Sequence, residues 1–445
     1  MGGLVFSSGP SPLFTPRMDP AIYKYIRDFC CTKLREPFVV VVSPIPGPAK
    51  KDYGDIDIFV AWERDVVFSS STRTDRRKSL LPTDGPLTVA VDLFHPERTI
   101  KTRATGLTMA VPWPAALPKE IAGSDGADHG DASNPRYIQV DLRLFDSLEQ
   151  LQWLLFKNAH GDMWGILGSI IRPFGLFIDD HALHIRILEM EATYPKLATV
   201  LLTKDPSEVL DFLGLKQDRA QWEEPFASTE DLFEYAATCR LFSTSTRALE
   251  RSNIKPSDRR RLDKRHNFRK YLDEFIPAMR QAGRYATVSA TRDSVRAEAF
   301  ERFPGARHAY EARLMDLRKE KQSQALWRCV IKAAIPPSDN DQQAYKHWRS
   351  NLAKALKKII MQDDDSLGVR PATPLRDSDG LYDEDRVRQF VADTWQEVGR
   401  LAWKENQEKY AAKLAAQKSA KGDSSDESLS IEDLKRMDLG DKKAG

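Results

Sequence analysis

The stretch Tyr53-Gly54-Asp55-Ile56-Asp57-Ile58-Phe59-Val60 decides the fold of this chain. It is an apolar run rich in strand-forming residues, and two acidic residues lie two positions apart within it. Side chains alternate along a strand, so Asp55 and Asp57 point to one face and Ile56 and Ile58 to the other. Adjacent carboxylates raise each other's pKa unless a cation lies between them. Such oxygen ligands suit Mg²⁺, so the pair is a candidate metal site. The alternative is a half-buried strand with a polar solvent face.

A second strand and a turn-rich loop precede this stretch. Residues 37–42, Pro-Phe-Val-Val-Val-Val, form an apolar run of strand length. The loop that follows, residues 43–54, contains three prolines, Gly47 and the adjacent Lys50 and Lys51. The two lysines are candidates for phosphate contacts, and the alternative is that they are solvated loop charges.

A third strand carboxylate comes from Tyr137-Ile138-Gln139-Val140-Asp141-Leu142-Arg143-Leu144. This run alternates, which places Gln139, Asp141 and Arg143 on one face. Residues 87–93 and 105–111 also have the composition of strands, and Asp92 in the first of them is a rival third carboxylate. We prefer Asp141 because its strand leads directly into a helix and a hairpin.

The residues after Asp141 carry clear start and turn signals. Ser147-Leu148-Glu149-Gln150 has the pattern of a capping box and predicts a helix start. Residues 174–187 then predict a hairpin with Asp179-Asp180-His181 near its turn.

This order of elements resembles the nucleotidyltransferase superfamily, which includes DNA polymerase beta-like and poly(A) polymerase-like enzymes. The signature of that family is Gly-Ser, a loop with a second Gly, and a strand with alternating Asp residues. Ser43 and Gly47 stand at the Ser and second Gly, whereas Val42 replaces the first Gly. His160-Gly161-Asp162 stands where family X polymerases have Thr-Gly-Ser, and Asp179-Asp180 where they have Asn-Glu. The resemblance covers residues 37–187.

The resemblance implies an enzyme that moves a nucleoside monophosphate from a nucleoside triphosphate to an acceptor hydroxyl and releases pyrophosphate. Asp55, Asp57 and Asp141 would be the catalytic ligands of Mg²⁺ or Mn²⁺, which clamp the attacking and leaving oxygens. The triphosphate would contact Ser43, Gly47, Lys50 and Lys51, and His160 and Gly161 would lie near the nucleotide. One alternative is a catalytically inactive binding or scaffold protein of the same fold. Another is an RNA-binding protein that uses the basic residues 251–270. The alternative without a function is that these residues form the exposed face of a helix.

Composition narrows the class of protein. The chain has 445 residues, a net charge of +2 and 30% charged residues, with no apolar run long enough to span a membrane and no secretory signal pattern. The four cysteines show no zinc-ligand spacing. We therefore expect a soluble intracellular protein, cytoplasmic or nuclear, without a membrane partner. RNA or another nucleic acid is a candidate acceptor, and the sequence leaves the base and the oligomeric state open.

The expected fold class is α+β. A nucleotidyltransferase-like mixed sheet with flanking helices is expected over residues 18–195, followed by a mainly α-helical domain over residues 196–418, with helices near 292–335, 341–361 and 383–418. Residues 1–17 and 419–445 are expected to be disordered tails.

Overall fold

The computed structural model describes residues 3–64, 67, 85–102, 105–114, 117, 135–218, 222–245, 265–335 and 343–420. The chain divides into two compact units, Met1–Tyr310 and Glu311–Gly445. Residues 196–310 therefore belong to the same unit as the predicted catalytic region, and the division differs from the boundary expected at residue 195.

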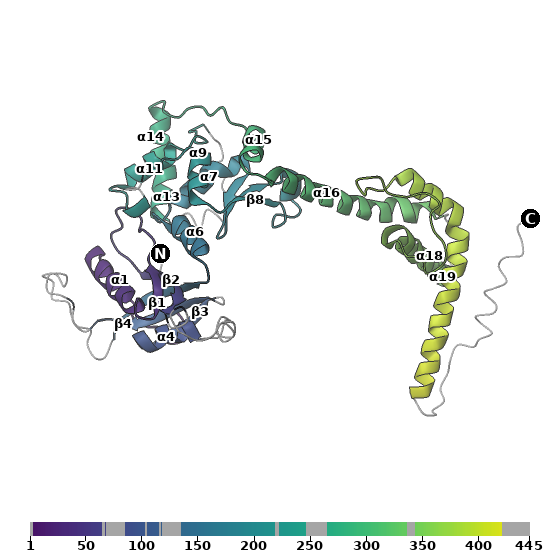
Figure 1. The fold of residues 1–445 in the computed structure, drawn as a ribbon, viewed down its shortest axis with the longest axis horizontal. Helices are drawn as coiled ribbons and strands as arrows, with labels where there is room; N and C mark the ends of the chain where they lie inside the picture. Colours follow the sequence, from purple (N-terminus) through teal and green to yellow (C-terminus); the bar gives the residue numbers. More distant parts are fainter. Residues whose placement is uncertain are drawn as a thin grey trace, which may run out of the picture. The chain divides into compact units, whose positions relative to one another are not determined.

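The first unit contains a five-stranded mixed sheet (Figure 1). Its strand order is β1 (Phe38–Val42), β2 (Asp55–Glu63), β5 (Tyr137–Phe145), β4 (Gly106–Pro112) and β3 (Arg98–Thr102). β2 and β5 are parallel, and all other neighbours are antiparallel. The mixed sheet with helices confirms the α+β prediction.

One face of the sheet is apolar and covered by helices. Ile56 and Ile58 of β2 are fully buried with side chains of α1 (Pro20–Leu34) and α4 (Gly85–Phe94). α1 begins at Pro20 because Asp19 accepts hydrogen bonds from the backbone N–H groups of its first turn. Burial of each large apolar side chain contributes about 1.5–3 kcal/mol. Because strand side chains alternate, this burial turns the carboxylates of β2 to the opposite face.

Residues 87–93, predicted as a strand, instead lie within α4. Leu87, Ala90 and Phe94 are buried at helical spacing, whereas Asp92 is exposed. A short apolar run rich in β-branched residues does not distinguish a strand from a helix by periodicity alone, which explains the error. Asp92 is therefore not a strand carboxylate, and the rival to Asp141 is removed.

Residues 3–17, expected to be a disordered tail, lie against the sheet. Phe6 is 1% exposed and packs with Ala110 and Tyr137. The backbone N–H of Val5 donates to Oε1 of Gln139 at 3.2 Å. The Gly, Ser and Pro content suggested disorder, but the apolar Phe6 anchors the segment. The other expected tail, from residue 419, lies almost entirely outside the described residues.

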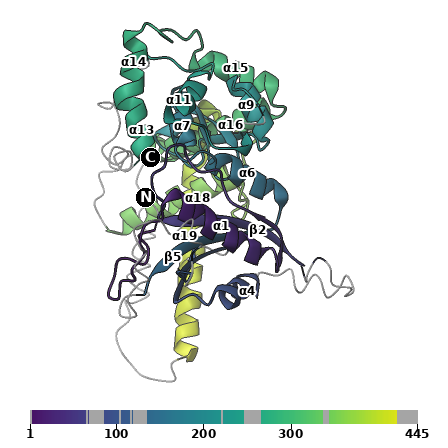
Figure 2. The same ribbon diagram turned by 90° about the vertical axis from the view of Figure 1, so that its left-hand side faces the viewer.

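The remainder of the first unit is mainly helical, with one small sheet. The predicted hairpin is present as β6 (Leu176–Ile178) and β7 (Leu183–Arg186), and β8 (Thr199–Thr203) pairs with β7. The helical elements are α6 (Leu148–Asn158), α7 (Met163–Ile171), η1 (Arg172–Phe174), α8 (Leu188–Glu191), α9 (Pro206–Leu213), α11 (Thr229–Ala237), α13 (His266–Lys270), η4 (Tyr271–Phe275), α14 (Ile276–Gln281) and α15 (Arg292–Arg302). α7 contacts α11 and α13, and Figure 2 shows these helices grouped together.

The second unit is helical. It consists of most of α16 (Ala306–Ala325) followed by η5 (Leu326–Ile331), α17 (Lys332–Ala334), α18 (Gln343–Gln362) and α19 (Glu384–Ala420). The apolar faces of α18 and α19 meet in one core that includes Leu352, Leu356, Val391 and Val398. Within the part of the chain that the structure describes, no helix is both long and apolar enough to cross a membrane.

The packing of α18 on α19 depends on a glycine. A Cβ atom placed on Gly399 of α19 would overlap the indole carbon Cζ2 of Trp348. The Trp348 ring also lies edge-on to Trp395, at 6.2 Å between ring centroids, so it cannot easily move away.

We predict that Gly399→Ala lowers the stability of the second unit by about 1–3 kcal/mol, because an overpacked contact forces the helices apart. The matched control is Gly168→Ala in α7, where an added Cβ meets nothing within 4 Å. That control should be neutral or stabilising by up to about 1 kcal/mol. Thermal unfolding of both full-length variants, followed by circular dichroism, measures the difference. Equal midpoints would contradict the packing described here.

Candidate active site

Strand register brings the predicted carboxylates to one face of the sheet. Asp57 of β2 is paired with Asp141 of β5, and Asp141 is paired on its other side with Thr108 of β4. Asp55 is paired with Gln139. Neighbouring strands lie about 4.8 Å apart and paired residues share a face. Asp57, Asp141 and Thr108 therefore form a row across three strands, with Asp55 one pleat away.

The fold raises the pKa of two of these carboxyl groups. Desolvation raises the pKa of Asp57 to about 7, and the charges of Asp55 and Asp141 add to the shift. The pKa of Asp141 is also raised, chiefly by burial. Asp57 is nevertheless exposed to solvent, so a cation in solution can reach it. A cation would relieve the repulsion that these shifts report.

Asp141 is held by hydrogen bonds from the side chains of Thr108 and Gln139. Its Oδ2 accepts from Nε2 of Gln139 at 2.9 Å. Gln139 is 2% exposed, and its own Oε1 is used by Val5 of the N-terminal segment. Oδ1 of Asp141 is buried without a hydrogen-bond partner among the described residues. A buried carboxylate oxygen in this state costs desolvation energy unless a ligand satisfies it.

The donor set fits a hard cation, but the ligands are not drawn together. Carboxylate oxygens from Asp55, Asp57 and Asp141 suit Mg²⁺ or Mn²⁺. Yet no group of three His, Cys, Asp or Glu side chains within the described ranges lies close enough to hold a metal ion. The three carboxylates share a face and a register, and their mutual repulsion opposes closer approach.

The loop after β1 is tied to the carboxylate strand. Ser43 Oγ donates to the backbone carbonyl of Asp57 at 2.7 Å. The Tyr23 phenol forms a hydrogen bond with Ser43, and burial raises the pKa of Tyr23 to about 12. The Ser43 hydroxyl predicted to contact the triphosphate is therefore engaged within the chain.

Lys50, one of the two lysines of the loop, lies near the carboxylates. Burial lowers the pKa of Lys50, which the nearby charges of Asp55 and Asp57 oppose, and its Nζ lies 4.3 Å from the centroid of the Tyr53 ring. Both Lys50 and Lys51 are exposed to solvent.

Gly47 and Gly161, predicted as nucleotide-side residues, pack against each other. The backbone N–H of His160 donates to the Ile45 carbonyl at 2.8 Å. A Cβ on Gly161 would lie 3.3 Å from Cα of Gly47, and Gly161 has φ +63°. The His160 side chain is fully buried against Trp222 and Phe226. The structure therefore brings the turn to the loop, but it turns the His160 ring into an aromatic core.

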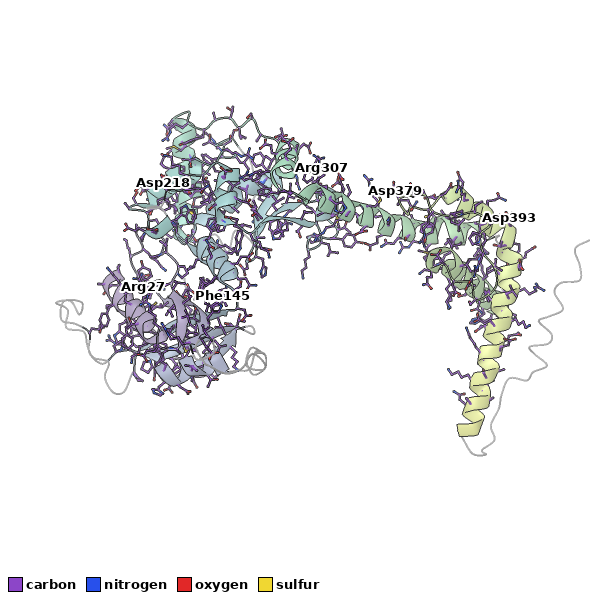
Figure 3. The ribbon with its side chains drawn as sticks, viewed as in Figure 1. Arg27, Phe145, Asp218, Arg307, Asp379 and Asp393 are labelled. Carbon is purple, nitrogen blue, oxygen red and sulfur yellow. The ribbon has the colours of Figure 1, made fainter. Side chains whose placement is uncertain are left out.

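Further residues reach the site that sequence reasoning did not assign to it. Arg143 lies two residues after Asp141 on the same face, and its charge lowers the pKa of Asp57 and Asp141 against the larger effect of burial. Its guanidinium lies 5.8 Å from the centroid of Phe59, which packs on Phe145. Phe145, the last residue of β5, is labelled in Figure 3. The alternation of β5 was the signal that could have identified Arg143.

Two more residues come from the described end of the basic segment 251–270. Asn267 Nδ2 lies 3.8 Å from the position of a Cβ on Gly47. Arg265 Nε lies 3.9 Å from Oδ1 of Asp162, next to the His160–Gly161 turn. The RNA-binding alternative was placed on the whole segment 251–270, of which residues 251–264 lie outside the described residues.

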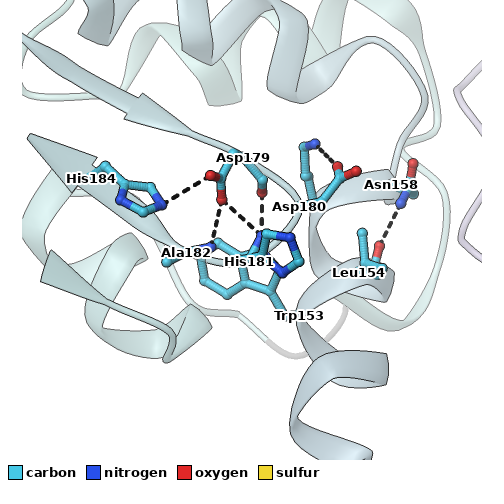
Figure 4. Close-up of polar contacts among 9 residues, drawn as sticks. Trp153, Leu154, Asn158, Asp179, Asp180, His181, Ala182 and His184 are labelled. Atoms are coloured by element: carbon cyan, nitrogen blue, oxygen red, sulfur yellow. Dashed lines mark hydrogen bonds and ion pairs between the residues drawn. The ribbon is translucent and has the colours of Figure 1, made fainter. Parts of the chain in front are cut away.

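The hairpin acids have partners within the hairpin and its neighbour helix (Figure 4). Oδ1 of Asp179 accepts from the backbone N–H groups of His181 and Ala182 at 2.8 and 2.9 Å. Its Oδ2 lies 3.1 Å from His184 Nε2. Asp180 forms an ion pair with Lys157 of α6. Asp179 thus closes the turn, which is the role that its geometry supports.

We predict that Asp179→Ala lowers the free energy of unfolding at pH 7 by about 1–2 kcal/mol, because two turn hydrogen bonds are lost. Burial alone would raise the pKa of Asp179, but the His181 N–H, the His184 charge and the Ala182 N–H together lower it. The charge-dependent part of its stabilisation is therefore present above the unfolded pKa of about 4 and lost as pH falls through the folded value. Urea unfolding across pH 3–7 measures both effects.

The control for that experiment is Asp180→Ala. It removes an ion pair whose side chains are 25% and 38% exposed, and surface pairs contribute about 0–1 kcal/mol. A loss at Asp180 as large as that at Asp179 would argue against the turn-closing role.

We predict that Asp57→Asn stabilises the metal-free chain at pH 8, because it removes a charge that Asp55 and Asp141 repel. A carboxyl whose folded pKa is about 7, above an unfolded value of about 4, makes stability fall as pH rises between these values. The gain at pH 8 should be about 1–2 kcal/mol after allowance for solvent screening. At pH 5 the gain should be smaller.

Urea unfolding in EDTA at pH 5 and pH 8 provides the measurement. Asp92→Asn is the matched control, because that carboxylate is exposed on α4, and no pH-dependent gain is expected from it. An Asp57→Asn variant less stable than the wild type at pH 8 would refute the charge cluster.

Comparisons with known proteins give a weak structural likeness. No model of a protein family matches the chain, and no curated protein matches it. Two solved structures of Leishmania infantum polymerase beta are similar to it, one a ternary P/T complex and one a ternary gap complex. The first is 12% identical, covers 48% of this chain and 78% of that chain, and has a TM-score of 0.32. The second is 13% identical, with coverages of 50% and 68% and a TM-score of 0.28.

Both structures come from the superfamily that residues 37–187 resemble, the nucleotidyltransferases. Because these TM-scores are low, the function is inferred from the geometry of this chain and not from the likeness.

Proposed function

We propose that the chain is a metal-dependent nucleotidyltransferase. It would transfer a nucleoside monophosphate from a nucleoside triphosphate to an acceptor hydroxyl. A bond would form between the acceptor oxygen and the α-phosphorus, the bond to pyrophosphate would break, and the hydroxyl would lose its proton. The observation that supports this proposal is the register of β2 and β5, which pairs Asp57 with Asp141 and leaves Asp55 on the same face.

Asp55, Asp57 and Asp141 would hold Mg²⁺ or Mn²⁺. The fit is supported by the all-oxygen donors, by the raised pKa of Asp57 and Asp141, and by the unsatisfied buried Oδ1 of Asp141. When bound, the metal supplies neutralisation of the charge on the transferring phosphoryl group and activation of the attacking oxygen.

The chain's own residues would position the substrate. Lys50 carries the positive charge of the loop that lies nearest Asp55 and Asp57, so it is the proposed contact of the triphosphate, with Lys51 as an exposed second cation. Ser43 holds the loop to the backbone of Asp57. Gln139 orients Asp141, and Arg143 adds a positive charge to the same face.

A second candidate is a catalytically inactive nucleotidyltransferase-fold protein that acts as a binding or scaffold module. One observation favours it. The Ser43 hydroxyl and the Gly47 backbone, which the resemblance assigns to the triphosphate, are both engaged by other parts of the chain. The two candidates differ in whether a nucleoside triphosphate binds in a metal-dependent way.

We predict that Asp57→Asn and Asp141→Asn each lower nucleotide transfer by about 10²–10⁴-fold, because each removes a charged ligand that stabilises the transition state. Calorimetry with each of the four ribonucleoside triphosphates, in Mg²⁺ and then Mn²⁺, identifies the base before transfer is assayed. Asp92→Asn should retain wild-type binding and transfer.

Full transfer activity in Asp57→Asn would exclude the proposed catalytic assignment. A well-folded wild-type chain that binds no nucleotide with either metal would instead support the scaffold candidate.

A further inference from the structure

The helix α18 of the second unit carries charged side chains of one sign only, and all of them are positive. Its sequence from Gln343 to Gln362 contains five basic residues and no acidic residue. Its apolar face is buried in the core with Leu352, Leu356 and Ile359. Lys354 and Lys358 are exposed and Lys357 is half-buried, so three positive charges lie within little more than one turn. Like charges at this spacing repel unless an anion lies beside them.

A tryptophan extends this charge beyond α18. Nζ of Lys332, in α17, lies 4.6 Å from the centroid of the Trp327 ring, and Nζ of Lys357 lies 5.2 Å from it. Cation–π attraction thus places the ammonium groups of Lys332 and Lys357 at the same indole ring. Within the described residues, neither lysine forms an ion pair.

A small polar cavity continues the same surface toward α19. Its volume is about 170 Å³. It is lined by side chains that include Asn351, Lys354, Lys358, Ser366, Asn406 and Lys409. Two acids also line it. Glu405 pairs with Lys409 at 2.5 Å. Hydrogen bonds from Ser366 lower the pKa of Asp364, and the charges of Lys358 and Lys409 lower it further. The positive charges outnumber these acids, and Lys354 has no ion-pair partner among the residues that the structure describes.

We propose that this surface, the α18 basic patch (Lys332, Lys354, Lys357, Lys358 and Lys409), binds the phosphate backbone of a nucleic-acid strand. Neighbouring ammonium groups neutralise successive phosphates and release their counterions. The amides of Asn351 and Asn406 supply donors and acceptors beside them. The binding does not require the proposed transferase activity.

The chemistry of α18 favours a nucleic acid over an anionic membrane. A helix that lies on a membrane buries large apolar side chains beside its basic ones. α18 exposes no large apolar side chain in its described residues, because its aliphatic side chains face the core. Its lysines are therefore placed for a charged polymer in water.

The test is equilibrium binding of the full chain to labelled 20-nucleotide RNA and DNA strands of one sequence, followed by fluorescence anisotropy. The chain carries Asp57→Asn and the buffer contains EDTA, so neither metal nor transfer contributes. The patch variant is Lys354→Gln/Lys357→Gln/Lys358→Gln. The matched control, Lys319→Gln/Lys321→Gln/Lys404→Gln, removes the same charge from three lysines of the same unit, of which Lys321 and Lys404 are exposed and Lys319 is half-buried.

We expect the patch variant to bind about 10-fold more weakly at 100 mM salt. The slope of log K against log salt should also fall in magnitude by about 2, since each neutralised phosphate of a single strand contributes about 0.7. The control should bind like the parent chain. Circular dichroism melts confirm that both variants fold.

The other outcomes separate the explanations. No binding by the parent chain, or equal losses in both triple variants, overturns the proposal. Binding to phosphatidylserine vesicles that the patch variant loses, with strand binding unchanged, overturns it in favour of a membrane. A preference for RNA or DNA that the patch variant weakens supports it and names the source. No transfer by the wild-type chain in Mg²⁺ or Mn²⁺, with strand binding intact, would count against the catalytic proposal alone.

Discussion

The parallel pairing of β2 with β5 is the constraint on which the candidate site depends. Parallel strands cannot be joined by a tight turn, and here the connection between them includes α4, β3 and β4. Register on a sheet with one buried face is strongly specified, because a slip of one residue moves every side chain to the other face. Ile56, Ile58, Val140 and Leu142 fix it by their burial. Asp57 therefore meets Asp141 as a consequence of core packing.

This arrangement imposes an electrostatic cost that the fold partly offsets. Burial, with the charges of Asp55 and Asp141 on the same face, raises the pKa of Asp57 to about 7, and Lys50 and Arg143 supply the opposing positive charge. The N-terminal segment adds order at the same place. Gly3 packs so closely on Gly54 that a Cβ would overlap the Gly54 backbone, and Val5 reaches Asp141 through the buried amide of Gln139. A group of carboxylates that repel one another, held in place by well-packed neighbours, is expected at a functional site.

Sequence patterns predicted the features that depend on neighbouring residues, such as strand alternation and helix caps. Alternation in β2 and β5 placed the carboxylates on their faces, and the capping pattern at Ser147 marked the start of α6. Contacts distant in sequence were out of reach. Phe6 orders its segment only because Ala110 and Tyr137 are placed to receive it. Leu87, Ala90 and Phe94 make α4 a helix because the core meets them at helical spacing. Asn267 approaches Gly47 through the packing of α13, which no short motif encodes.

The departure from the family signature at Val42 has a structural explanation. Val42 continues the β1–β2 ladder and pairs with Phe59, so the strand extends to the position where the family has its first glycine. Val42 does not have a positive φ, so its backbone conformation does not require glycine. The loop then begins at Ser43, whose hydroxyl fixes it to Asp57, and ends at Lys50 beside the carboxylates. A loop fastened at its start, at Ile45 by His160, and at Gly47 by Gly161 is a rigid element. Any phosphate it contacts must therefore be met by Lys50 and by backbone groups already in place, because the loop has little freedom to close around it.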